Sequence, residues 1–335
     1  MKLKRLRIMC DYNTLKLKDY NLWKYTTKGS ANAIYRYNGP HNPLFTHKVI
    51  RVRLTSCELS TKEVFEFMNS LKLEKLREYI PRTDILSVDG RFMDNLQRQS
   101  PASVKLNRLE TDVLLLDDIF THKISAYHEI CLSNHYKFYI FKKGDQEEFI
   151  LEFKPKWLYK PPAIFKTCRN CAQSILKKQK FSNCTLLLLS MPEGVRIWCR
   201  NLQNELERQG YNIAVYDSLF QVISEHYDLI EILYKLENKN CNDMHNALRQ
   251  LSSPKGVTDV IRNSMSLRDV SITINLSSHE VHVLDIDPKP TSKWKKWREQ
   301  EIKNSPLYLC ESNCSLNSEG DTVNVATNPH CPVKF

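Results

Sequence analysis

The sequence has no hydrophobic run long enough to cross a membrane. Its longest apolar stretch, TLLLLSM at 185–191, falls well short of the roughly 18 residues that a spanning helix needs. The N-terminal MKLKRLRIMCDYN is basic, but it lacks the apolar segment and cleavage site of a secretory signal. We therefore expect a soluble protein of the cytosol, the nucleus or both, without a membrane partner.

The cysteines do not predict a disulfide framework. The chain has 11 of them, an odd and scattered set that indicates a reducing compartment. Cys168 and Cys171 form a CxxC pair in CRNC, but no second pair follows closely, as a small zinc module would require. A second group lies near the C-terminus, namely Cys310, Cys314, His330 and Cys331. We expect no metal site at these cysteines, which are interpreted as buried or incidental thiols.

Acidic residues are outnumbered in this chain. The 38 Asp and Glu residues face 49 Lys and Arg, which gives a net charge of +11. This charge indicates an anionic partner, which could be nucleic acid, a membrane surface or a phosphorylated small molecule. The 335 residues contain no internal repeat and no long low-complexity linker, and their number is sufficient for two lobes.

Residues 1–120 predict a strand-rich N-lobe. The segment 21–38 reads as a hairpin with Gly29 at its turn, and HKVIRVRL (47–54) reads as a third strand. Ser60 and Glu63 form a capping box that opens a helix to about Leu76. A further strand is expected at DVLLLDDI, residues 112–119.

Residues 121–308 predict a helix-rich C-lobe that follows two more strands, at 135–143 and from 150 onward. Helices are expected at 161–180, at 193–210 and at 218–238. The tail, 309–335, has little apolar patterning and is expected to be disordered.

The strand expected at ILEFKPKWLYK (150–160) places Lys154 and Lys156 on one face. Like charges two residues apart repel, and Pro155 removes a ladder donor. The arrangement costs stability unless an anionic group lies against that face. An edge strand guarded by lysines is the alternative, and this short segment alone favours it.

The segment 266–290 predicts a β-hairpin with a loop longer than two residues, centred near Ser277. This register sets Asp269 opposite Asp285. Two such carboxylates repel unless a cation or proton lies between them, and a divalent metal beside a base suits phosphoryl transfer, with Lys289 and Lys293 downstream for phosphate. The alternative is a pair of strand-end aspartates that face water.

The order of elements is kinase-like, although the GxGxxG, VAIK, HRD and DFG motifs of protein kinases are absent. We therefore predict an α+β, two-lobed kinase-like fold with a β-rich N-lobe, a helix-rich C-lobe and a catalytic hairpin.

Six stretches resemble the inositol-pentakisphosphate 2-kinases, particularly the short fungal members: KGSAN, KVIRV, LEFKPKWLY, CRNC, SLRDV and LDIDPKPTSKW. The resemblance implies an ATP- and Mg²⁺-dependent kinase of an inositol polyphosphate kinase-related fold. Its substrate would be inositol 1,3,4,5,6-pentakisphosphate, phosphorylated on the 2-hydroxyl to give inositol hexakisphosphate. We expect a monomer that needs no nucleic acid.

The resemblance also implies roles for individual residues. Asp269 would be the base, Lys154 would approach the transferring phosphate, and Asp285 would bind magnesium. The nucleotide would lie on N-lobe residues, with Arg51 in place of the protein-kinase lysine: Gly29, Ser30, Ala31, Asn32, Arg51, Asp117 and Ile119. A mainly basic set would hold the inositol phosphate: Lys105, Lys156, Arg169, Gln173, Lys177, Arg196, Lys289 and Lys293. Gln173 stands where the family often has a histidine.

A nucleic-acid-binding protein is the alternative of a different class. The segments KWLYK and KWKKW interleave lysines with aromatic residues, a pattern that suits base stacking beside phosphate contacts. Asp269 and Asp285 would repel a nucleic-acid backbone, so the sequence favours the kinase. The same two acids disfavour a pseudokinase scaffold.

Overall fold

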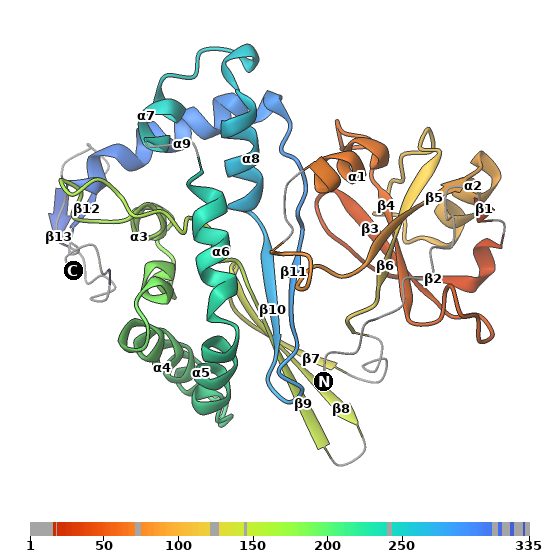
Figure 1. Ribbon diagram of the computed structural model, residues 1–335, viewed down its shortest axis with the longest axis horizontal. Coiled ribbons are helices and arrows are strands. Elements are labelled where there is room, and N and C mark those ends of the chain that lie inside the picture. The colour runs from red at the N-terminus through yellow and green to blue at the C-terminus, as the bar shows by residue number, and fades with distance from the viewer. Residues whose placement is uncertain are drawn as a thin grey trace. The chain divides into compact units, whose positions relative to one another are not determined.

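The computed structural model describes residues 16–17, 19–70, 75–120, 127–143, 146–239, 243–309, 314–316, 322–324 and 331. These residues belong to two compact units, one within 1–73 and 81–122 and the other within 74–80 and 123–335. The first unit consists mainly of strands and the second is rich in helices (Figure 1). The α+β, kinase-like class predicted from the sequence is confirmed.

The first unit is built on one six-stranded sheet. Its order is β1 (Lys16–Leu17), β5 (Thr83–Val88), β6 (Asp112–Asp117), β4 (Lys48–Arg53), β3 (Asn32–Tyr37) and β2 (Trp23–Lys28). The hairpin predicted around Gly29 is confirmed as β2 and β3. Alternation along β4 buries Ile50 and Val52 in the core of this unit, as a strand with one face inward requires.

Two helices complete the first unit, α1 (Thr61–Ser70) and α2 (Gly90–Gln99). The predicted capping box at α1 is confirmed, because the Ser60 amide donates to Glu63 Oε2 (2.8 Å) and the Glu63 amide donates to Ser60 Oγ (3.3 Å). The predicted helix end at Leu76 was wrong, since α1 ends at Ser70 and residues 75–79 form turns.

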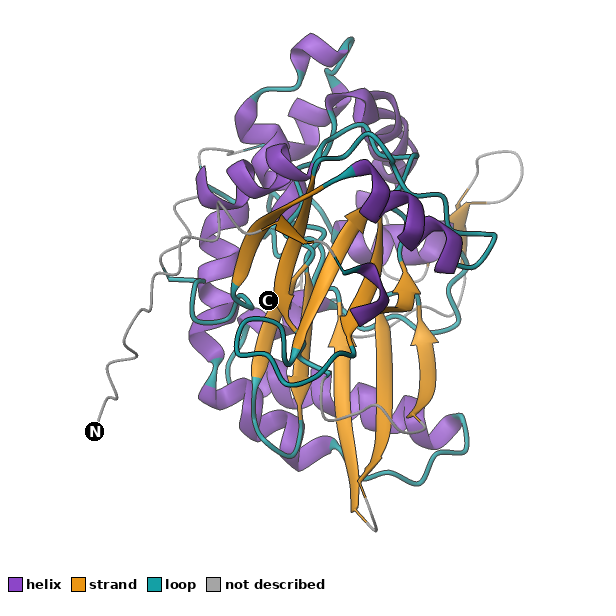
Figure 2. Ribbon diagram, turned by 90° about the vertical axis from the view of Figure 1, so that its right-hand side faces the viewer, coloured by secondary structure: helices purple, strands orange, loops and turns teal. Residues whose placement is uncertain are grey.

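The second unit contains a five-stranded antiparallel sheet in the order β11 (Val281–Leu284), β10 (Ser271–Asn275), β9 (Gln146–Phe153), β8 (Tyr136–Lys143) and β7 (Tyr127–Ser133). Helix α4 (Glu193–Arg208) packs on this sheet through Trp198, whose ring lies 5.0 Å from that of Phe153 and 6.0 Å from that of Tyr136. Figure 2, coloured by secondary structure, shows the long strands and the helices around them. Residues 75–80 cover the other edge of the hairpin, where the Val283 amide donates to the Tyr79 carbonyl (2.8 Å).

The second unit also contains α3 (Arg169–Leu176), α5 (Tyr216–Glu225), α6 (Tyr227–Glu237), α7 (Met244–Arg249), α8 (Asp259–Leu267) and α9 (Trp294–Tyr308). Short 3₁₀ turns are present at Tyr20–Leu22, Thr185–Leu189, Pro254–Gly256 and Thr291–Lys293. The helix predicted at 193–210 is confirmed as α4, and Gly210 follows it with φ +85°, a conformation that glycine adopts without strain.

Two helix predictions were wrong in extent. The segment 218–238 is two helices, because His226 leaves helical geometry (φ −115°, ψ 28°) between α5 and α6. The segment 161–180 is helical only over α3, since Pro161 and Pro162 cannot donate backbone hydrogen bonds and Cys168 caps the first turn. Most of the tail from 309 lies outside the described residues. Its described parts include the paired strands β12 (Cys314–Leu316) and β13 (Thr322–Asn324) and the buried Cys331.

Candidate active site

The two hairpin aspartates lie at the same end of the β10–β11 hairpin. The register pairs Ser271 with Leu284 and Ile274 with Val281. The predicted loop longer than two residues is confirmed, but the register that set Asp269 opposite Asp285 was wrong by one residue. The Asn275 amide donates to the Glu280 carbonyl (2.9 Å), which leaves 276–279 in the turn, an even number where the sequence predicted an odd one. Asp269 precedes β10 and Asp285 follows β11.

Lys154 and Lys156 lie beyond the end of β9, which stops at Phe153, so the expectation that they share a strand face was wrong. Lys156 has φ +53°, a left-handed conformation that costs a non-glycine residue stability and persists where surrounding contacts hold it. The Lys154 ammonium lies 3.4 Å from Asp285 Oδ2 and 2.6 Å from Ser271 Oγ. Lys156 pairs instead with Asp269. Each lysine therefore meets a different hairpin carboxylate.

Asp269 also forms an ion pair with Lys289. Burial alone would raise the pKa of Asp269, but Lys156 and Lys289 outweigh it and hold that pKa well below its usual range. Burial lowers the pKa of Lys156, and Asp269 opposes that shift. Asp269 is therefore a carboxylate at neutral pH, and it can accept a hydrogen bond from a hydroxyl group.

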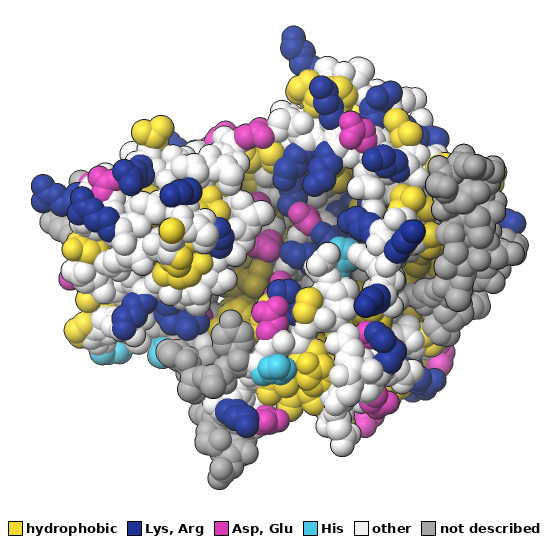
Figure 3. Space-filling model, turned by 180° about the vertical axis from the view of Figure 1, so that it is seen from behind, with side chains coloured by type: hydrophobic (Ala, Val, Ile, Leu, Met, Phe, Trp, Pro, Cys, Tyr) yellow, Lys and Arg dark blue, Asp and Glu magenta, His cyan; other side chains and the backbone are white. Residues whose placement is uncertain are grey.

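Asp269 and Lys156 line a cavity of about 220 Å³ in the second unit. Among the described residues, its wall carries seven Lys and Arg side chains and one carboxylate, that of Asp269. Figure 3 shows a face of the molecule where Lys and Arg side chains gather, with Asp and Glu side chains among them. Of the predicted substrate residues, the cavity brings together Lys156, Arg169, Gln173, Lys177, Lys289 and Lys293. A site with this excess of positive charge attracts a small, highly charged anion.

Two buried arginine arrangements support this wall. Arg169 lies over the Trp157 ring (4.0 Å from its centroid), and its Nε donates to Glu301 (2.9 Å). Arg268 lies over the same ring at 4.3 Å and pairs with Glu237 (3.4 Å). Burial raises the pKa of Glu237 to about 8, although Arg268 lowers it. The arginines are thus fixed by stacking and by their contacts with Glu301 and Glu237 before any ligand binds, which reduces the entropy lost on binding.

Several cavity residues were missed by sequence reasoning: His135, Trp157, Asn170, Met265, Arg268, Lys296, Trp297 and Gln300. Lys296 carried a usable signal, because it lies one helical turn from Lys293 in a lysine-rich segment. His135 carried none. Burial and then the nearby lysines Lys156, Lys177 and Lys154 lower the pKa of His135 to about 4, so its imidazole is neutral at neutral pH.

Two predicted substrate residues are not among those lining the cavity. Arg196 pairs with Glu193 on its own helix (3.0 Å) and lies over Phe220. Lys105 is in the first unit, where its carbonyl accepts from the Thr55 amide (2.9 Å). The small pocket next to the cavity is lined by Lys154 together with His135 and Gln173.

The predicted nucleotide residues all belong to the first unit. The Gly29 amide closes the hairpin turn on Asn32 (2.9 Å), and the Leu54 amide donates to Ala31 (2.9 Å), so the end of β4 holds the loop that contains Ser30. Asn32 is buried and accepts from Arg53 (3.1 Å). The buried Arg51 lies on β4, and the exposed Asp117 lies on the adjacent strand β6. Ile119 follows β6 and is partly exposed.

The residues around Asp285 suit a magnesium ion. Its side chain is 54% exposed, and Ser271 Oγ lies 3.4 Å from Oδ2, so a carboxylate and a hydroxyl oxygen lie together, and the Lys154 ammonium contacts both of them. Mg²⁺ commonly takes one or two carboxylates and completes its shell with water and substrate phosphates. Asp285 has φ +60°, and its carbonyl accepts from the Asp287 amide (2.8 Å).

A family model described as "Inositol-pentakisphosphate 2-kinase" matches residues 25–212, more than half of the chain. This chain belongs to the inositol-pentakisphosphate 2-kinase family. Proteins named inositol-pentakisphosphate 2-kinase are similar to it in Saccharomyces cerevisiae (28% identity, covering 50% of this chain and 57% of that protein), Debaryomyces hansenii (25%, covering 76% and 72%) and Kluyveromyces lactis (24%, covering 83% and 92%). The match thus spans little more than half the length of the S. cerevisiae protein. No described helix is both long and apolar enough to span a membrane.

Proposed function

We propose that this protein transfers a phosphoryl group from ATP to the 2-hydroxyl of inositol 1,3,4,5,6-pentakisphosphate and so forms inositol hexakisphosphate. The observation that carries the proposal is the cavity of the second unit, whose described lining has seven Lys and Arg residues around one carboxylate. Five phosphate groups at about −1.5 to −2 each bring roughly eight to ten negative charges. A ligand with that charge offsets the mutual repulsion of the lysines and arginines in the wall.

Asp269 is the proposed catalytic base. It accepts a hydrogen bond from the 2-hydroxyl, fixes the direction of attack and takes the proton as the bond to phosphorus forms. Lys156 and Lys289 lie against both Asp269 and the cavity, so they can orient the carboxylate and bind substrate phosphate. Lys154, close to Asp285, is placed to stabilise charge on the transferring phosphate.

Asp285 is the proposed magnesium ligand, and the ion when bound would neutralise charge on the nucleotide phosphates. Residues of the first unit are proposed to bind the nucleotide, with the hairpin turn over the phosphates and the backbone at 117–119 against the adenine: Gly29, Ser30, Ala31, Asn32, Arg51, Asp117 and Ile119.

The test is incubation with ATP, Mg²⁺ and a panel of inositol phosphates, followed by phosphorus NMR and measurement of ADP. We expect one new phosphate resonance with the pentakisphosphate that has a free 2-hydroxyl. A pentakisphosphate whose free hydroxyl lies elsewhere on the ring is the matched control. Absence of ADP and of product with every member of the panel would contradict the proposal. Binding to a labelled oligonucleotide that inositol pentakisphosphate does not displace would instead favour a nucleic-acid-binding protein.

A further inference from the structure

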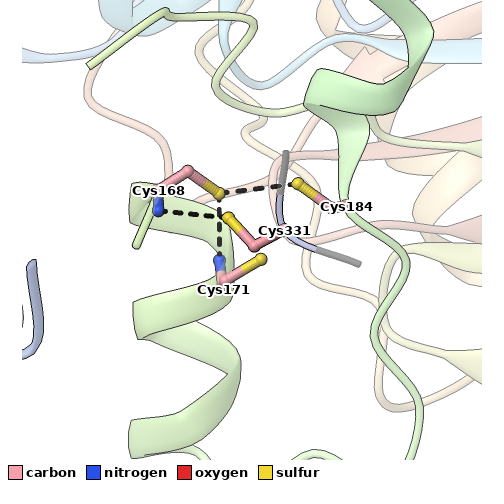
Figure 4. A group of neighbouring side chains, drawn as sticks. All are labelled: Cys168, Cys171, Cys184 and Cys331. Carbon is pink, nitrogen blue, oxygen red and sulfur yellow. Dashed lines mark hydrogen bonds between the residues drawn. The ribbon is translucent and has the colours of Figure 1, made fainter. Parts of the chain in front are cut away.

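The start of α3, which carries Arg169, is held by buried cysteines. Cys168 caps the helix, and its sulfur accepts a hydrogen bond from the Cys171 amide (3.5 Å). Cys184 and Cys331 join this pair, and all four sulfur atoms lie within 4.8 Å of one another (Figure 4). The expectation of buried thiols is confirmed for these four, although the partners of CRNC come from distant positions in the sequence. Outside the described residues lie two members of the group near the C-terminus, Cys310 and His330. The backbone at Arg169 is therefore fixed by its neighbours, and its side chain is held separately.

Glu301 on α9 is a carboxylate that the proposed reaction does not use. Its side chain is fully buried (0% exposed), and each of its oxygens has its own partners. Oε2 accepts from Arg169 Nε (2.9 Å), whereas Oε1 accepts from the Tyr308 hydroxyl (2.6 Å) and from His245 Nδ1 (2.5 Å). Burial alone would raise the pKa of Glu301, but His245, Arg169 and Tyr308 outweigh it and lower that pKa. Glu301 therefore carries a negative charge next to Arg169.

His245 holds Glu301 in one orientation. Its imidazole stacks on the Trp157 ring (5.6 Å between centroids) and meets the Tyr308 ring at 4.9 Å. Among the described residues, His245 Nε2 has no hydrogen-bond partner, so the contact with Glu301 sets how the imidazole is turned. Rotating Glu301 would leave buried donors of His245, Tyr308 and Arg169 without acceptors, which costs stability. The carboxylate is therefore in place before a ligand arrives.

Arg169 gives one of the five N–H groups of a guanidinium to Glu301. No other residue that the structure describes forms a hydrogen bond with its terminal nitrogens, Nη1 and Nη2, although the side chain is only 10% exposed and lines the cavity. Two N–H groups side by side on Nη1 and Nη2 match two oxygens of one phosphate. The terminal edge of Arg169 is thus available to an anion in the cavity.

We propose that Glu301 is a positioning residue, which holds Arg169 so that Nη1 and Nη2 face the cavity and bind one substrate phosphate through two hydrogen bonds. This inference rests on the proposed function, because it takes a phosphate of the inositol substrate as the ligand. A mobile arginine loses rotamer freedom when it binds, and the contact with Glu301 removes most of that loss. Removing Glu301 should therefore weaken binding, whereas a carboxylate that acts by charge alone would strengthen binding of an anion once it is removed.

The variant Glu301→Gln tests the sign of this effect. A glutamine amide has one oxygen, so it cannot accept from Arg169 on one side and from His245 and Tyr308 on the other. Calorimetry without ATP should give a Kd for inositol pentakisphosphate about tenfold above that of the parent, as the loss of one charge-assisted contact predicts. The KM should rise in parallel, while kcat stays within about twofold. Unchanged or tighter binding would overturn the proposal.

The matched control is Glu205→Gln. Glu205 is also buried and holds an arginine, since Arg208 Nη2 lies 2.6 Å from its Oε1, but it is on α4 and is not among the residues that line the cavity. Thermal unfolding should show a loss of stability in both variants, whereas only Glu301→Gln should bind the ligand more weakly. An equal loss of affinity in Glu205→Gln would show that general destabilisation weakens binding, and the positioning role would be wrong.

A double variant keeps the test valid if Glu301→Gln alone folds poorly, because it removes both buried charges. In Arg169→Met the unbranched side chain can still pack on Trp157, and adding Glu301→Gln should then cause no further loss of affinity. A further loss would show that Glu301 acts by a route other than Arg169, which contradicts the proposal.

Nitrogen-15 spectra of protein with labelled arginine report on the contact without a ligand. The Arg169 Nε–H signal, identified by its absence from Arg169→Met, should exchange slowly with solvent in the parent and in Glu205→Gln but rapidly in Glu301→Gln. A signal that Glu301→Gln leaves unchanged would refute the positioning role. Parent protein that binds inositol pentakisphosphate without phosphorylating it would contradict only the proposed function, because the affinities and the spectra would still measure what Glu301 does.

Discussion

Replacing Asp269 with asparagine should separate substrate binding from turnover. Asp269 is the one carboxylate among the described residues that line the cavity, and it pairs with Lys156 and Lys289. The substitution removes a charge that repels substrate phosphate and releases both lysines for the ligand. A unit charge a few ångströms from a phosphate of −1.5 to −2 contributes about 1–2 kcal/mol when solvent screens the pair as in water. Affinity for inositol pentakisphosphate should therefore rise roughly tenfold.

Turnover should fall in the same variant. Asparagine keeps the shape of the side chain but cannot take the proton of the attacking hydroxyl, a contribution worth about 10²–10⁴-fold in kcat. Stability should fall only modestly, because the Asp269 side chain is 41% exposed and solvent screens part of its ion pairs with Lys156 and Lys289. The loss of activity therefore would not reflect unfolding.

Calorimetry without ATP gives the affinity, ADP release gives kcat, and thermal unfolding checks the fold. Asp217→Asn, at an exposed position on α5, is the control for a carboxylate lost outside the cavity, and it should behave like the parent. Near-parental kcat in Asp269→Asn would remove Asp269 from the base role. Weaker binding by that variant would refute the electrostatic reasoning even if turnover fell.

Four further results are expected. Asp285→Asn should weaken magnesium-dependent nucleotide binding and recover part of its activity at high Mg²⁺, and a response identical to that of Asp269→Asn would contradict the separate roles. Lys156→Ala and Lys296→Ala should raise KM for inositol phosphate more than they lower kcat, whereas Lys303→Ala, exposed on α9 and not lining the cavity, should not. Affinity for inositol phosphate should fall more steeply with salt than affinity for ATP, and parallel slopes in calorimetry would argue against a polyphosphate cavity. Lysines help to hold the pKa of His135 at about 4, so a bound polyanion should raise that pKa. Binding near pH 6 should therefore take up more protons in the parent than in His135→Asn, and calorimetry in buffers of different ionisation enthalpy measures that uptake.

Sequence reasoning predicted the elements whose signals are local. The Ser60–Glu63 capping box, the hairpin around Gly29 and the apolar alternation of β4 each depend on residues within a few positions of one another. The limits of these elements were less predictable. Helix α5 ends at Glu225 although the apolar pattern continues through α6, because hydrophobic periodicity does not reveal that the single residue His226 leaves helical geometry.

The members of the cavity wall were partly predictable because a family resemblance selected them, but their geometry was not. The one-residue error at the hairpin arose from the Asn275–Glu280 pairing, which no turn signature marked. Lys154 and Lys156 were expected on a strand, whereas the chain leaves β9 before either of them. The convergence of Cys331 with Cys168 depends on tertiary structure across more than 160 positions, for which the sequence offers no local signal.

Four charged residues of this site share one structural property. Lys154 and Lys156 follow the end of β9, Asp269 follows the end of α8, and Asp285 follows the end of β11. Each helix or strand holds the position of its last residue, so the residues that follow start from a fixed point. Beyond a strand, neighbouring side chains no longer have to point to opposite faces of the sheet. Lys156 and Asp285 use that freedom to adopt positive φ, a strained conformation for both residue types. Ion pairs with the opposite charge stabilise the strained positions, so the same contacts that hold the fold locally also set the charge of the candidate catalytic group.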